Sequence, residues 1–121
     1  MNIIKKRIKS FGYAFKGIAK FVSGEVNAWI HCTAIVVVTL MGFYFHITPT
    51  EWTAVVICFG MVLAAEGFNT AIERLVNLVS PGFHPIAGDV KDIAAGAVLV
   101  CAISAAIVGL IIFVPYLKEV C

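Results

Sequence analysis

Three long apolar runs dominate this sequence of 121 residues and constrain its fold more than any other feature. They occupy residues 26–46, 52–79 and 93–117. Each is long enough to cross the hydrocarbon core of a bilayer, which takes roughly 20 residues in a helix. With 61% hydrophobic and 13% charged residues and a mean hydropathy of +1.00, the chain is too apolar for an ordinary soluble domain. We therefore predict one all-α integral membrane domain over residues 1–121, with three transmembrane helices.

The segment before these runs, residues 1–24, has the pattern of an amphipathic helix. Its apolar residues recur at steps of four and three, at Ile4, Ile8, Phe11, Phe15, Ile18 and Val22. Lysines fall mostly off that line, so the opposite face is basic. This pattern is typical of a helix that lies on the surface of an anionic leaflet, although packing against the protein's own bundle would produce it too.

The distribution of basic residues predicts the orientation of the chain in the membrane. Six of the nine precede the first apolar run, whereas the turn at residues 47–51 has none. Because basic residues gather on the cytoplasmic side, we expect the N-terminus and the loop around residues 80–92 to be cytoplasmic.

The second apolar run contains an unusual group of polar residues, Glu66, Asn69 and Glu73. At about 100° per residue in a helix, all three project from one narrow stripe. Ionisable groups inside a membrane span are costly and usually functional. Asn69 alone could equally be a polar contact between packed helices, but the two glutamates together favour a functional site.

The predicted orientation brings charged residues together at the cytoplasmic surface. Glu25, Glu73, Lys91 and Asp92 would lie at a similar depth, and Glu66 about 10 Å deeper, near the inner edge of the hydrocarbon. Carboxylates suit magnesium with substrate phosphates, and a lysine suits phosphate. Glu66 could accept the proton of a lipid hydroxyl during phosphoryl transfer.

The sequence has no P-loop motif and no glycine-rich dinucleotide motif. Any nucleotide site must therefore be assembled by the helices themselves. We expect no nucleic-acid partner.

Several segments resemble one known family. They are Ala65-Glu66, residues 69–73, His84-Pro85 and residues 91–99. In these segments the chain strongly resembles the small bacterial membrane lipid kinases, the prokaryotic diacylglycerol kinase and undecaprenol kinase family. The resemblance covers nearly the whole chain. It implies a homotrimer of three-span subunits in the bacterial cytoplasmic (inner) membrane, each with an N-terminal surface helix. It also implies MgATP as the phosphoryl donor and active sites between neighbouring subunits.

The resemblance also implies roles for individual residues. Glu66 would be the general base, with Asn69 as a supporting catalytic group, and Glu25 and Glu73 would bind magnesium. The residues implied in contact with the nucleotide are Tyr13, Phe83, His84, Gly88, Lys91 and Asp92, in addition to the two magnesium ligands.

Two positions depart from the family's usual pattern, which has arginine at Trp29 and aspartate at Asn77. Neither departure replaces one of the three glutamates. However, Trp29 lies one helical turn from Glu25 and could alter the metal or lipid site. Residues 25–31, His84-Pro85 and residues 94–97 look more like the undecaprenol kinase branch. We therefore expect undecaprenol as acceptor, with diacylglycerol as the alternative.

Two other classes of membrane protein compete with this interpretation. A small transporter would also need carboxylates in the membrane, but carriers usually place them near the midplane and show repeat symmetry, and the sequence shows neither feature. A structural subunit without catalysis would leave Glu25, Glu66 and Glu73 unexplained. Lipid phosphorylation that depends on Glu66 would separate the kinase from both.

Overall fold

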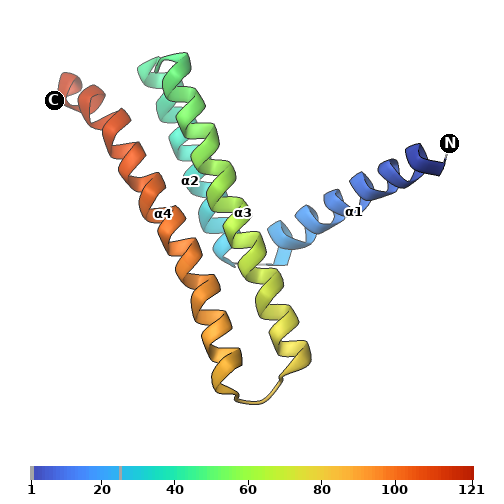
Figure 1. The fold of residues 1–121 in the computed structure, drawn as a ribbon. Coiled ribbons are helices and arrows are strands. Elements are labelled where there is room, and N and C mark those ends of the chain that lie inside the picture. Colours follow the sequence, from blue (N-terminus) through green and yellow to red (C-terminus); the bar gives the residue numbers. More distant parts are fainter. Residues whose placement is uncertain (1, 25) are drawn as a thin grey trace.

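The computed structural model describes residues 2–24 and 26–121, with side chains except those of residues 24–28. It contains four helices in chain order, α1 (Asn2–Gly24), α2 (Val26–Phe45), α3 (Pro49–Val79) and α4 (Pro85–Val120). Helices α2, α3 and α4 run alongside one another, and α1 leaves them at a steep angle (Figure 1). The most extensive packing is between α3 and α4. The prediction of an all-α fold is therefore confirmed.

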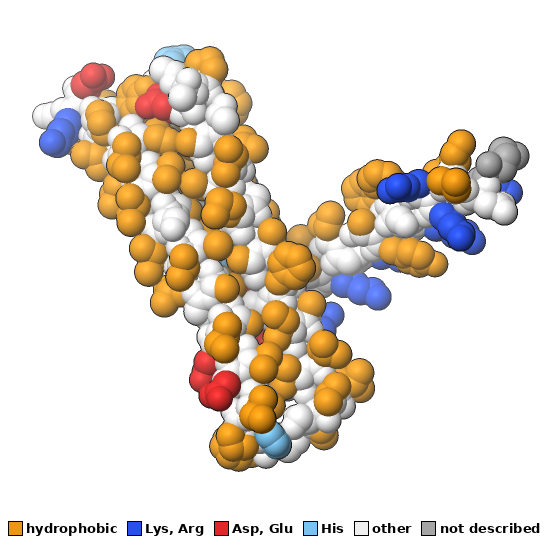
Figure 2. Space-filling view, viewed as in Figure 1, with side chains coloured by type: hydrophobic (Ala, Val, Ile, Leu, Met, Phe, Trp, Pro, Cys, Tyr) orange, Lys and Arg blue, Asp and Glu red, His pale blue; other side chains and the backbone are white. Residues whose placement is uncertain are grey.

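Helix α1 is continuous through Gly12 and Gly17, and almost all of its described side chains are exposed. Its apolar stripe, from Ile4 to Ile18, is not covered by the rest of the described chain. Basic side chains gather along the same helix (Figure 2). A position on the membrane surface would cover this stripe, and that position stays a prediction.

Two helices, α3 and α4, are long and apolar enough to cross a membrane. In α2, the apolar part within the described residues is Trp29–Phe45, which is shorter than a full span. The prediction of three spans is thus supported for the second and third, and the first stays a prediction.

The connections from α2 to α3 and from α3 to α4 are both shorter than expected. Helix α3 begins at Pro49 rather than at residue 52, because Thr48 caps it and Glu51 completes a capping box. The Thr48 hydroxyl accepts from the Glu51 backbone N–H at 3.2 Å, and the Thr48 N–H donates to Glu51 Oε1 at 2.9 Å. Proline is compatible with the first turn, where its missing N–H needs no partner.

The predicted loop around residues 80–92 is shorter in the structure, because a helix begins within it and contains the whole apolar run 93–117. Helix α4 begins at Pro85, and the ring of His84 caps it by accepting from the Ile86 backbone N–H at 3.2 Å. Gly88 and Lys91 therefore lie on a helix, which fixes their spacing. The helix also continues beyond residue 117, through Pro115, to Val120.

The apolar core lies at the end of the bundle where α2 turns into α3. It consists of Ile47, Val55, Ile112 and Phe113, which contact partly buried neighbours from all three helices. At the same end, the Tyr116 hydroxyl donates to Glu51 Oε1 at 2.5 Å and joins α4 to the start of α3. The polar stripe of α3 lies toward the opposite end, so core and polar stripe are separate.

Replacing Gly42 by alanine should destabilise the fold by about 1–3 kcal/mol, because overpacked cores must shift side chains or backbone. A Cβ at Gly42 would lie 2.6 Å from Trp52 Cη2 and 3.2 Å from Ile47 Cδ1. Gly60→Ala is the matched control, since a Cβ there meets nothing within 4 Å. Denaturant unfolding in micelles measures both variants. Equal stability of Gly42→Ala and the wild type would contradict the close packing.

Candidate functional site

A group of buried polar residues lies on one face of α3. Glu66 is 4% exposed, and Asn69 and Thr70 are each 8% exposed. They are the buried polar or charged residues found in the described part of the chain. Glu73, one turn beyond Asn69, is exposed. The stripe predicted for the second apolar run thus forms, with Glu66 at its buried end and Glu73 at its open end.

Glu66 is held from the neighbouring helix α2 by His31. The His31 Nε2 atom lies 3.1 Å from Glu66 Oε2. An ionised carboxylate can only accept hydrogen bonds, so Nε2 carries the proton when Glu66 is charged. This contact is the hydrogen bond that the structure gives to the Glu66 carboxylate within the described residues.

The sequence analysis assigns no role in the site to His31 and so misses this contact. A signal was present. His31 lies six residues after Glu25 and Glu66 lies seven before Glu73, which places both about 9–10 Å below the charged surface. What the sequence could not supply is the rotation of α2 that turns the ring toward α3.

Asn69 lies between Glu66 and Glu73 on α3 and hydrogen bonds to Glu73. Its Nδ2 donates to Glu73 Oε1 at 3.3 Å. Its other polar atom, Oδ1, is buried and has no hydrogen-bond partner among the described residues. Because an unpaired buried acceptor costs about 1–3 kcal/mol, this oxygen marks a place for a donor or a cation.

At the end of the bundle where α3 connects to α4, Lys91 on α4 contacts the last turns of α3. Its Nζ donates to Asn77 Oδ1 at 2.6 Å. Asn77 is one of the two departures from the family pattern, and its neutral amide orients the lysine without cancelling its positive charge. Asp92 follows on the exposed surface of α4.

The remaining predicted site residues are less closely grouped. Phe83 is 96% exposed beside the capping residue His84, and Gly88 N donates to His84 O at 3.0 Å. Tyr13 is exposed on α1, the helix that diverges from the bundle (Figure 1). Glu25 lies outside the described residues. In the described part of the chain, no three His, Cys, Asp or Glu side chains form a metal-binding group.

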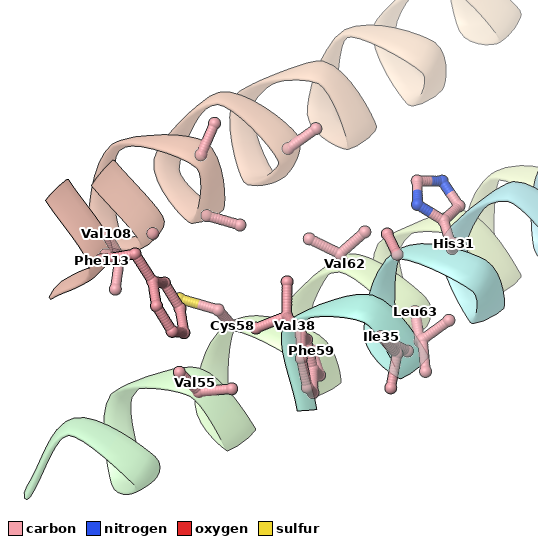
Figure 3. Close-up of a pocket in the computed structure, with 15 residues that line it drawn as sticks. His31, Ile35, Val38, Val55, Cys58, Phe59, Val62, Leu63, Val108 and Phe113 are labelled. Carbon is pink, nitrogen blue, oxygen red and sulfur yellow. The ribbon is translucent and has the colours of Figure 1, made fainter. Parts of the chain in front are cut away.

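Two hollows flank the polar stripe. The first, with a volume of about 280 Å³, lies between α2, α3 and α4 and is lined almost entirely by apolar side chains. His31 lies at one end of it and Phe113 at the other (Figure 3). His31 therefore borders both the hollow and the Glu66 carboxylate. The second hollow, of about 510 Å³, lies between the end of α3 and the start of α4 and includes His84.

Comparison with known proteins gives consistent matches. The sequence model of the family described as prokaryotic diacylglycerol kinase matches residues 12–113. An undecaprenol kinase of Bacillus subtilis (strain 168) is 38% identical over 116 residues, covering 96% of this chain and 94% of the relative. A diacylglycerol kinase of Synechocystis is 35% identical over 88% of this chain and 61% of that protein. A diacylglycerol kinase of Escherichia coli (strain K12) is 25% identical over 83% of this chain and 82% of its own length.

Proposed function

Because this chain belongs to the prokaryotic diacylglycerol kinase family, we propose that it transfers the γ-phosphate of ATP to the hydroxyl group of a membrane lipid. Undecaprenol is the favoured acceptor. The undecaprenol kinase that matches 96% of this chain at 38% identity supports that choice. Diacylglycerol is the alternative, supported by the name of the family and of the other two relatives.

The observation that carries this proposal is the buried Glu66 carboxylate beside an apolar hollow. Such a hollow suits a hydrocarbon chain, and the polar side chain of His31 lines one end of it. In the proposed reaction, the lipid oxygen bonds to the γ-phosphorus and the bond from that phosphorus to the bridging oxygen of ADP breaks. The hydroxyl proton passes to the Glu66 carboxylate, which acts as general base.

The residues on the open end of the stripe fit a magnesium ion. Magnesium is usually held by one or two carboxylates together with substrate phosphates. Glu73 offers an exposed carboxylate, and Asn69 Oδ1 is a neighbouring oxygen with no described partner. We propose that Glu73 and Glu25 hold the ion, which when bound would neutralise charge on the phosphates.

Lys91 supplies the positive charge proposed for nucleotide binding, held in place by Asn77. Asp92 follows it on α4. The loop end, with its hollow beside His84, is the proposed place for the rest of the nucleotide. The further contacts proposed there are Tyr13, Phe83, His84 and Gly88.

A homotrimer in the bacterial cytoplasmic membrane, with the N-terminus inside, completes the proposal. In one chain α2, α3 and α4 leave large apolar side chains exposed, such as Leu40, Met61 and Leu110. Lipid tails and neighbouring copies would cover these faces. Neighbouring copies would also bring α1 and its Tyr13 toward the other site residues.

The test is γ-phosphate transfer from MgATP by the purified protein in mixed micelles, with undecaprenol and a diacylglycerol offered side by side. Preference for undecaprenol is the expected result. Preference for diacylglycerol would retain the kinase and change its acceptor. Transfer to neither lipid would overturn the proposed function.

A further inference from the structure

His31 is placed where it can control the geometry of the proposed base. It reaches from α2 to a carboxylate on α3, and the Nε2 to Oε2 distance of 3.1 Å is that of a hydrogen bond. Glu66 is only 4% exposed, so its carboxylate is largely shielded from water. A buried charge is costly without such a donor.

The contact uses one carboxylate oxygen and leaves the other without a hydrogen bond from the described residues. With Oε2 engaged by the imidazole N–H, Oε1 is the oxygen that is left to receive a proton. His31 also lines the apolar hollow, whereas Glu66 does not. A lipid hydroxyl reaching the base along this hollow would pass the imidazole first.

We propose that His31 is a positioning residue for lipid phosphorylation: its Nε2–H holds Glu66 Oε2, so that the free carboxylate oxygen faces the acceptor hydroxyl. This inference rests on the proposed function, because it assigns a role within the same site. The competing interpretation is a purely structural connection between α2 and α3. The two differ in which kinetic constant changes and in whether a second donor restores activity.

The test compares His31→Ala and His31→Gln in the phosphotransfer assay. His31→Ala should lower kcat about 10–100-fold, the usual cost of removing a partner that orients a functional group, and change KM for the lipid less than about threefold. His31→Gln keeps an N–H at a similar reach, so it should restore kcat to within about fivefold of wild type. Loss confined to KM, or no rescue by glutamine in a variant as stable as wild type, would overturn the inference.

A double-mutant cycle makes the test independent of folding defects. If His31 acts through Glu66, adding His31→Ala to Glu66→Gln should lower the residual activity no further. An equal fall in both backgrounds would indicate a structural role and overturn the inference.

His46→Asn is the matched control, because His46 is exposed at the opposite end of α2. Its φ of 54° lies in the left-handed region that asparagine tolerates. This variant should keep wild-type kcat. A wild-type protein without transfer would overturn the proposed function and this inference with it. An active wild type with an unaffected His31→Ala variant would overturn only the inference.

Discussion

Replacing Glu66 by glutamine should lower kcat for lipid phosphorylation by about 10²–10⁴-fold, the usual contribution of a general base. Glutamine has nearly the same shape and cannot take the hydroxyl proton. Its side-chain oxygen can still accept the hydrogen bond from His31, so the connection between α2 and α3 should survive. Steady-state transfer of the γ-phosphate in mixed micelles measures the effect.

Glu119→Gln is the matched control for this substitution. Glu119 is an exposed carboxylate in the last turn of α4, far along the helix from the stripe. It should leave kcat unchanged, and both variants should unfold like the wild type. Transfer by Glu66→Gln at a rate close to that of Glu119→Gln would remove Glu66 as the base.

Replacing Glu73 by glutamine should weaken binding of the divalent cation about 10–100-fold. The substitution removes a charged oxygen ligand, and an interaction with a charged group contributes about 1.5–3 kcal/mol. The backbone should tolerate the change, because Glu73 is exposed and its described hydrogen bond comes from Asn69. The activity of the variant should therefore need more Mg²⁺, with part of the loss recovered at high concentration.

Titration with Mn²⁺ and a non-hydrolysable ATP analogue, followed by electron paramagnetic resonance, measures the same binding without turnover. Glu66→Gln should bind Mn²⁺ as the wild type does, which separates metal binding from proton transfer. Unchanged Mn²⁺ affinity in Glu73→Gln would show that Glu73 does not bind the metal.

The sequence predicts those features that depend on one helix alone. Run length and composition indicate the helical membrane domain, and spacing places Glu66 and Asn69 on one stripe, which the structure buries. Helix ends were less predictable. Pro49 and Pro85 were interpreted as parts of connections, whereas capping by Thr48 and His84 makes each the first residue of a helix.

Contacts between helices could not be derived from spacing. The contact of His31 with Glu66 depends on how α2 is rotated against α3. The hydrogen bond from Lys91 to Asn77 depends on the short connection that folds α4 back on α3. The unpaired Oδ1 of Asn69 is likewise visible only when the surrounding atoms are placed.

The distance between the apolar core and the polar stripe has a consequence for how such a chain can change during evolution. Val55 in the core and Glu66 in the stripe are both on α3, eleven residues or about 16 Å apart. Substitutions that alter melting behaviour can therefore accumulate around Ile47 and Ile112, which do not line the apolar hollow, while those that alter proton transfer accumulate around Glu66. A lineage could adapt to warmer or colder surroundings without altering its proton-transfer chemistry, whereas a change of the lipid chain would involve Val55 and Phe113, which belong to the core as well.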